Sequence, residues 1–368
     1  MSTTIHLERV CRFTSLRRHK LGVSLIEVVL VFAIVLLLIS LVIPALSSSR
    51  EAARSLNCKN NLREIGLATL SHESLQGKFV PANIGFRRVL LADTAFTNEW
   101  LEDSTSNFHW SKAPHTSSLV LLLPFLGEES AMSNAPTAFL SSRSYAEWDG
   151  EGWIGNLASI SELSKMRIPV FKCPSDAAMP IGESMSFCVA SQPVFRGDAT
   201  SEQALDGFLT RYITSSSAES TNYIATSGAH SGGKVPIAHM AKYDGILGSH
   251  KSLRIAEVTD GLSNTMLYGE SLGTINDGQR VGAYPWTFGA LGRGRGGLPW
   301  GATSNPSQPE AYLFGDSTSA NIAGFGSMHP LGVNIIRGDS STQKISRDVS
   351  LSLWYSLNGA ADGEVQYD

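Results

Sequence analysis

Residues Gly22–Pro44 read GVSLIEVVLVFAIVLLLISLVIP, and this stretch decides how the rest of the chain is delivered and folded. From Val28 to Ile43 the only polar residue is Ser40, so residues 28–46 are just long enough to cross a membrane as a helix. Glu27 is the one charged residue, at the start of this run. Because an ionisable side chain at the edge of a membrane segment is costly unless it is paired, Glu27 indicates a function.

Charge is distributed unevenly along the chain. Residues 1–22 hold five of the 29 Lys and Arg residues and one of the 33 acidic residues, so this leader carries +4 and the remainder −8. A basic start before an apolar run keeps the start in the cytoplasm and sends the rest across the membrane. The acidic, exported body also argues against a nucleic-acid partner.

The apolar run continues into a second helical pattern without a break. Between residues 49 and 74, apolar residues recur at helical spacing among charged ones. A helix from Ser24 to Leu75 would be about 75 Å long at ~1.5 Å per residue, with Pro44 loosening or kinking it. The predicted organisation is a basic leader (1–22), a transmembrane and assembly helix (23–46), an amphipathic continuation (47–76) and a globular β-rich head (77–368).

The chain has four cysteines, of which Cys11 lies in the leader. The other three predict one disulfide and one free thiol in an oxidising compartment. A Cys58–Cys173 bond would tie the helix to the head, whereas a Cys173–Cys188 bond would close a local loop. The spacing of the cysteines is compatible with either bond, so the sequence leaves the pairing open.

The N-terminal pattern resembles that of type IV prepilins and type II secretion pseudopilins, through Gly22, Glu27 and Pro44. The resemblance implies that a prepilin peptidase cuts after Gly22 and methylates the new amine of Val23, where the family most often has phenylalanine. Glu27 of an incoming subunit would then pair with the amine of a neighbour, since burying either charge alone is costly.

A second resemblance, to the DUF1559 family, covers nearly the whole mature chain. That family contains large prepilin-like proteins abundant in planctomycetes. The motifs that carry it are Cys58–Ala68 (CKNNLREIGLA), Leu119–Leu126 (LVLLLPFL), Phe171–Asp176 (FKCPSD), Thr221–Tyr223 (TNY) and Asp260–Glu270 (DGLSNTMLYGE).

The family's closing signature, His-x9-Asp-Gly, is partly present, as His329 and Asp339 followed by Ser340. Residues 330–339 read as a hairpin, with a turn at Pro330-Leu331-Gly332, a short strand from Val333 to Ile336 and another turn at Gly338-Asp339. We expect His329 and Asp339 to face each other across it as a structural clamp.

The fold class predicted for the chain is α+β and pilin-like. Repeated Asp-Gly pairs in a Gly, Ser and Thr-rich body predict an antiparallel sheet with long loop insertions, among them residues 83–114 and 289–309. The long N-terminal helix is expected to pack on this sheet.

Motifs for catalysis and metal binding are weak. Gly269–Gly273 fits the G-x-S-x-G elbow of esterases, but turn residues follow where a helix is needed, so Ser271 is not expected to be catalytic. No zinc motif is present among the nine histidines. Calcium is a cofactor candidate through Asp339 and Asp348, which lack an EF-hand spacing.

These patterns predict a structural subunit of a type IV pilus or type II secretion-like assembly, minor or large-headed, and no enzyme. Its partners would be prepilin peptidase, other pilin-like subunits and inner-membrane lipid, with the head in the periplasm or at the cell surface. The alternative is a tethered module that binds a glycan or a secretion substrate, and a secreted hydrolase ranks third. The aromatic contacts proposed for that module are Trp100, Trp110, Trp148, Trp153, Trp286 and Trp300.

Overall fold

The structure is a computed structural model that describes most of the helical and sheet core of the chain. The described residues are 24–84, 90–91, 116–133, 135, 162–178, 181–196, 205–214, 218–228, 244–248, 252–276, 278–287, 291–292, 314–315 and 324–363. The chain divides into two compact units, Met1–Arg50 and Glu51–Asp368. The second half of the long helix therefore belongs to the head unit.

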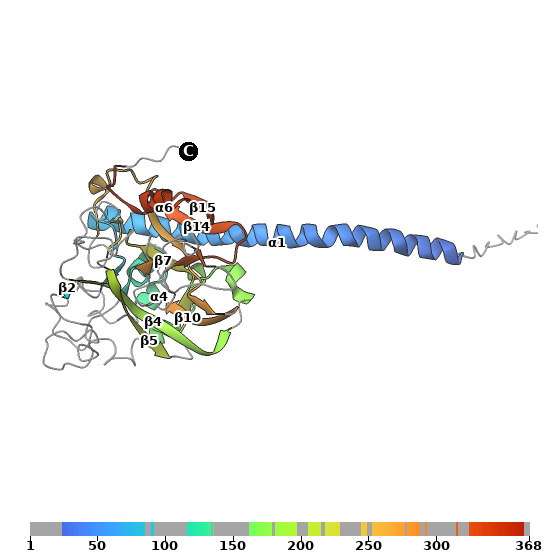
Figure 1. Cartoon of the computed structure of the whole chain (residues 1–368), viewed down its shortest axis with the longest axis horizontal. Coiled ribbons are helices and arrows are strands. Elements are labelled where there is room, and N and C mark those ends of the chain that lie inside the picture. Colours follow the sequence, from blue (N-terminus) through green and yellow to red (C-terminus); the bar gives the residue numbers. More distant parts are fainter. Residues whose placement is uncertain are drawn as a thin grey trace, which may run out of the picture. The chain divides into compact units, whose positions relative to one another are not determined.

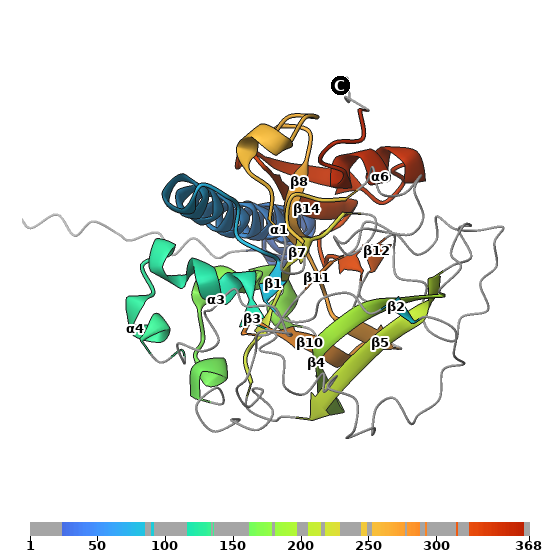
Figure 2. The same ribbon diagram turned by 90° about the vertical axis from the view of Figure 1, so that its left-hand side faces the viewer.

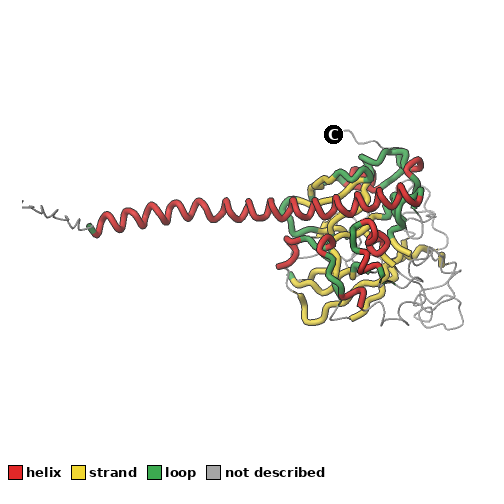
Figure 3. Tube along the Cα trace, turned by 180° about the vertical axis from the view of Figure 1, so that it is seen from behind, coloured by secondary structure: helices red, strands yellow, loops and turns green. Residues whose placement is uncertain are grey.

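The first element, α1, is one helix from Leu25 to Gln76, and Figure 3 shows it unbroken. Pro44 lies inside it and does not end it. Described residues before Glu51 are all exposed, and the 18-residue window with mean hydropathy 3.2 is 0% buried. By length and composition this part can cross a membrane, as an anchor or as a signal sequence.

Beyond Glu51 the helix has one buried face. Cys58, Leu62 and Ile65 are fully buried at spacings of four and three residues, which is the period of a helix face. Burying a leucine or isoleucine side chain contributes roughly 1.5–3 kcal/mol. This stripe therefore holds α1 onto the head.

A five-stranded sheet forms the centre of the head unit, in the order β11-β7-β8-β14-β15. Neighbours from β7 to β15 pair antiparallel, and β11 joins β7 in parallel. The strands are β7 (Tyr223–Thr226), β8 (Met266–Glu270), β11 (Leu291–Gly292), β14 (Gly332–Arg337) and β15 (Thr342–Ser346).

Both faces of this sheet are covered, since alternate side chains of a strand point to opposite faces. Tyr223 and Ile336 share a core with the buried stripe of α1, whereas Ile224 and Ile335 pack with α6 (Leu351–Asn358). Figures 1 and 2 both show α1 and α6 beside β14. The α1 face of the sheet is the one that carries the site described below.

A second sheet has the order β2-β4-β10-β6, with β5 paired to β4 and β9 to β10. It mixes antiparallel pairs with the parallel pairs β10/β4 and β2/β4. Its strands are β2 (Leu90–Leu91), β4 (Ile181–Arg196), β5 (Leu205–Thr214), β6 (Ser220–Thr221), β9 (Thr274–Asn276) and β10 (Gln279–Pro285).

Short elements complete the described part of the head. Two small sheets pair β1 (Asn83–Ile84) with β3 (Thr116–Ser117) and β12 (Phe314–Gly315) with β13 (Phe325–Gly326). The short helices are α3 (Ser118–Leu122) and α4 (Glu129–Met132), and the 3₁₀ turns are η2 (Leu123–Phe125), η5 (Pro169–Phe171), η6 (Pro174–Ala178) and η9 (Ile255–Glu257).

The α+β, pilin-like class predicted from the sequence is confirmed: a long N-terminal helix accompanies largely antiparallel sheets. The predicted strand at residues 333–336 is present within β14, and the predicted turn at Gly338-Asp339 is present at residues 338–341, where it joins β14 to β15. Most of the predicted insertions at 83–114 and 289–309 lie outside the described residues.

Candidate functional site

The site is built around a disulfide between Cys58 of α1 and Cys173, which follows η5. The Tyr223 hydroxyl donates to the backbone carbonyl of Cys58 at 3.3 Å. The backbone N–H of Cys173 donates to the Asn222 side-chain oxygen at 2.9 Å. Residues of α1, η5 and the β6–β7 segment therefore meet at this bond, which closes a separation of 115 residues.

His329 lies against the disulfide with a fully buried side chain. Its Nδ1 is 2.5 Å from Oε1 of Glu51. Its Nε2 is 3.3 Å from Oε1 of Glu270 and 3.5 Å from Sγ of Cys173. The imidazole is thus held between two carboxylates, one on each ring nitrogen.

Each carboxylate is fixed by further donors. The Ser175 hydroxyl lies 3.0 and 3.1 Å from the two oxygens of Glu51, whose side chain is 25% exposed. Asn334 donates its backbone N–H and its side-chain N–H to Glu270, each at 2.9 Å. Glu270 itself is buried, so these bonds compensate for lost hydration.

The surroundings raise the pKa of two side chains of the site, His329 and Tyr223. Burial alone would lower the pKa of His329, but the hydrogen bonds and charges of Glu270 and Glu51 outweigh burial and raise that pKa above its ordinary value of 6.5. Burial, followed by the charge of Glu270, raises the pKa of Tyr223. The Tyr223 hydroxyl therefore stays protonated and available as a donor.

Local geometry explains why these residues converge. Glu51 and Cys58 are seven residues apart on α1, two helical turns, and so share one face. Glu270 ends β8 beside Asn334 of β14, because Gly269 pairs with Ile335. His329 precedes β14 across a tight turn in which Leu331 has φ 71°.

A buried ion pair lies next to this cluster. Asp176 of η6 pairs with the guanidinium of Arg280 on β10, and both side chains are less than a tenth exposed. Asn222 donates to the other oxygen of Asp176, and Arg280 Nε donates to the Leu272 carbonyl at 3.0 Å. This network links the two larger sheets beside the disulfide.

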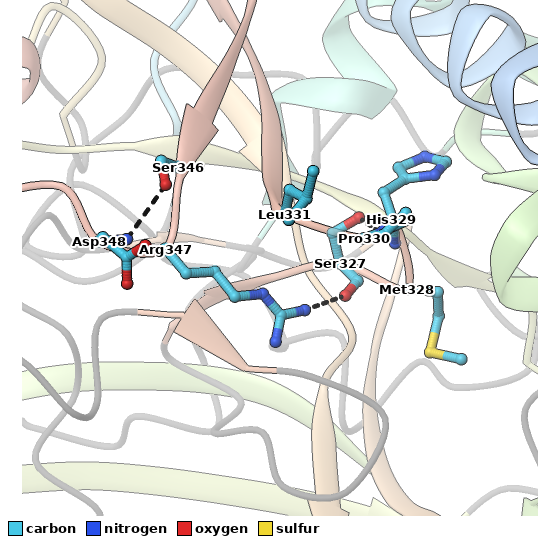
Figure 4. Close-up of a pocket in the computed structure, with 8 residues that line it drawn as sticks. All are labelled: Ser327, Met328, His329, Pro330, Leu331, Ser346, Arg347 and Asp348. Atoms are coloured by element: carbon cyan, nitrogen blue, oxygen red, sulfur yellow. Dashed lines mark hydrogen bonds between the residues drawn. The ribbon is translucent and has the colours of Figure 1, made fainter.

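A hollow of about 400 Å³ opens behind the histidine. Figure 4 shows the His329 ring turned away from Arg347 and Asp348, while Arg347 donates to the Ser327 carbonyl at 3.0 Å. The full lining is Ser327, Met328, His329, Pro330, Leu331, Ser346, Arg347 and Asp348. The imidazole nitrogens face the carboxylates and the disulfide, so the chemistry lies on the α1 side.

The structure joins Cys58 to Cys173, the first of the two pairings left open by the sequence. Cys188 falls within β4. Gly22 and Val23, the expected cleavage point, lie outside the described residues. Glu27 is exposed in the first turn of α1, where it accepts from the Ser24 backbone N–H at 2.8 Å.

Two predictions for the C-terminal segment are wrong. His329 and Asp339 lie beyond opposite ends of β14, a strand of six residues and so about 20 Å long, and cannot form a clamp. His329 instead meets Glu51 and Glu270, and Asp339 accepts from the Ser341 N–H. Asp339 and Asp348 likewise flank β15 at opposite ends, so they do not form one calcium site.

The esterase-like motif has no elbow geometry. Strand β9 follows Ser271, where a nucleophile elbow needs a helix. The Ser271 hydroxyl donates to the Gly324 carbonyl at 3.3 Å. Of the six tryptophans considered for ligand binding, Trp286 is buried and donates to Met166, and the other five lie outside the described residues.

Sequence reasoning missed both carboxylates of the site. Glu270 is the last residue of the DGLSNTMLYGE motif. Glu51 is seven residues before Cys58, a spacing that places both side chains on the same face of a helix and could have indicated that Glu51 lies near the disulfide. No pattern in the chain points to the pairing of either one with His329, which is 278 residues from Glu51.

A family model described as "Protein of unknown function (DUF1559)" matches residues 47–351. The chain therefore belongs to the DUF1559 family. No curated protein and no solved structure matches it.

Proposed function

We propose that the chain is a pilin-like structural subunit, exported by a prepilin pathway, that assembles through its N-terminal helix and does not catalyse a reaction. The observation that carries the proposal is the exposed apolar surface of residues 25–46. The large apolar residues there are 39–82% exposed, among them Leu25 at 82% and Val28 at 39%. Such a surface needs lipid or copies of the same helix to cover it.

In this proposal, Glu27 determines how neighbouring copies of the helix align along their length. In the chain alone its carboxylate caps the helix by accepting from Ser24, one residue after the expected new terminus at Val23. An ammonium group from a neighbouring copy would be a stronger, charge-assisted partner in lipid than a backbone N–H. Side-by-side helices would then be fixed at the point where amine and carboxylate meet.

The proposed arrangement places residues 1–22 in the cytoplasm and one span in the inner membrane. The head would face the periplasm, or the cell surface after assembly. Its size favours a minor or large-headed component over a subunit repeated at every position of a thin filament. Prepilin peptidase and other pilin-like subunits are the expected partners.

N-terminal sequencing of the mature chain tests the export route. Co-expression with prepilin peptidase should yield a chain beginning at Val23, and Gly22→Ala should block this cleavage. Ala45→Leu is the matched control. A secretory signal would be cut after a small-residue site, and Ala45-Leu46-Ser47 is the sequence that could serve as one; Ala45→Leu removes a small residue from it. A mature chain that begins near Ser47, and disappears in Ala45→Leu, would contradict the proposal.

Fractionation tests assembly separately from processing. Glu27→Ala should be cleaved normally yet be lost from sheared filaments or multi-subunit complexes. Glu64→Ala, an exposed carboxylate further along α1, should behave as wild type. Equal assembly of both variants would contradict the proposed role of Glu27. Single copies of the protein that stay in the membrane fraction would favour the tethered binding module.

A further inference from the structure

We propose that the Cys58–Cys173 disulfide, once reduced, becomes a four-ligand zinc site formed by both thiolates, the His329 imidazole and the Glu270 carboxylate. One ligand atom from each residue lies within 4.8 Å of all the others, and all four residues are buried. The inference is independent of the pilin-like role.

The distances among Cys173, His329 and Glu270 are already close to those of a zinc tetrahedron. With Zn–S of about 2.3 Å and Zn–N and Zn–O near 2.1 Å, tetrahedral sites have ligand separations of about 3.6 Å for S···N and S···O and about 3.4 Å for N···O. The Cys173 Sγ to His329 Nε2 distance is 3.5 Å, and His329 Nε2 to Glu270 Oε1 is 3.3 Å. Cys173 Sγ to Glu270 Oε1 is 4.0 Å.

Two of the four ligands are already held by hydrogen bonds of the kind that orient ligands in metal sites. In metal sites the nitrogen of histidine that does not bind the metal donates to a carboxylate, which fixes the ring and raises its basicity. Glu51 occupies that position on Nδ1 of His329, which leaves Nε2 facing the Cys173 sulfur. Asn334 fixes Glu270 in the same manner through two N–H donors.

The chemistry of the donors selects the metal. Two thiolates and an imidazole favour zinc over calcium or magnesium, which prefer oxygen ligands. Four protein ligands in a buried site leave no position for water or substrate, which is the pattern of structural zinc rather than catalytic zinc. The site would therefore hold α1 to the head in the reduced protein, as the disulfide does in the oxidised protein.

The interconversion balances with a dithiol as reductant. The dithiol passes two electrons and two protons to the disulfide, so that Cys58 and Cys173 become thiols and the donor becomes a disulfide. Zinc binding then releases the two thiol protons as both thiolates bind the metal. Separation of the two sulfurs to about 3.8 Å is the main movement that a tetrahedral site requires.

Cobalt titration of the full chain in detergent tests the site directly. After reduction with a phosphine and removal of the excess, Co²⁺ should bind once per chain with thiolate-to-cobalt charge-transfer absorption, and Zn²⁺ should displace it. The oxidised chain should show no such band. Glu51→Gln keeps all four ligands and should weaken Co²⁺ binding about 10–100-fold, whereas Glu64→Gln should leave it unchanged.

If the reduced chain is poorly folded, its thermal unfolding with and without Zn²⁺ tests the proposal instead. Zn²⁺ should then restore the cooperative transition and far-ultraviolet circular dichroism, and His329→Gln should abolish the rescue. A reduced chain that binds no Co²⁺ and gains no stability from Zn²⁺ would overturn the proposal. Equal Co²⁺ affinity in wild type, Glu51→Gln and His329→Gln would also overturn it, because binding would then rest on the thiols alone.

Discussion

Removing the disulfide gives the sharpest test of how α1 is held to the head. In the double variant Cys58→Ala, Cys173→Ala, the unfolded chain is freed from a closed loop spanning 115 residues. The chain-entropy relation gives a loss of about 4.8 kcal/mol for a loop of that length at 25 °C. A unit of roughly 300 residues has an unfolding entropy that converts this loss to about 7–8 °C in Tm.

Thermal unfolding of the oxidised chain in detergent with a chelator, followed by tryptophan fluorescence, measures this shift. Cys188→Ala is the control, and it should leave the Cys58–Cys173 bond intact in disulfide mapping. A bond from Cys173 to Cys188 would close only 15 residues and be worth about 3 kcal/mol. Mapping of that bond in the wild-type chain, or a Tm drop in the double variant below about 2 °C, would refute the reasoning.

The other predictions concern buried titratable side chains and a glycine whose backbone φ is positive. Because the pKa of His329 is raised in the folded state, its stabilisation is complete below pH 6.5 and is lost as pH rises through the folded pKa; His329→Gln should remove that loss from oxidised, metal-free melting curves. Asp176→Asn should cost about 3–5 kcal/mol in chemical denaturation, since it leaves the Arg280 guanidinium buried without its ion pair. Gly273→Ala should cost about 2–4 kcal/mol in the same assay, because Gly273 has φ 77° and a Cβ would overlap the Gly282 carbonyl oxygen.

Matched variants separate these effects from general damage. Burial lowers the pKa of His72, so stability from His72 is lost as pH falls below 6.5, and His72→Gln should alter the opposite limb of the pH profile. Gly127 has φ 75° but open space around a Cβ, so Gly127→Ala should cost only about 1–2 kcal/mol. If His72→Gln and His329→Gln change the same limb, or both glycine variants lose equal stability, the assignments are wrong.

The sequence predicted those features of the fold that depend on local pattern. The apolar run followed by an amphipathic stripe specified α1, and the turn residues around Val333–Ile336 specified the β14–β15 hairpin. Pro44 did not interrupt the helix, because α1 continues to Gln76. The face-to-face placement of His329 and Asp339 failed because both flank the same strand.

The site could not be predicted because its contacts are nonlocal. Glu51 and His329 meet only after α1 packs on the five-stranded sheet, and that packing depends on which strand faces point toward the helix. A single sequence carries period and turn signals but no record of which distant segments touch. The cysteine pairing was open for the same reason.

The wide separation of Cys58 from Cys173 also has a consequence for maturation. In a newly synthesised, still unfolded chain, Cys173 encounters Cys188 more readily than Cys58, by about 20-fold on loop-closure statistics. Random oxidation would therefore trap a local bond first. The native pair must be selected by docking of α1, so correct oxidation reports that the head has already begun to fold, and an isomerase acting on disulfides would speed the yield of mature protein.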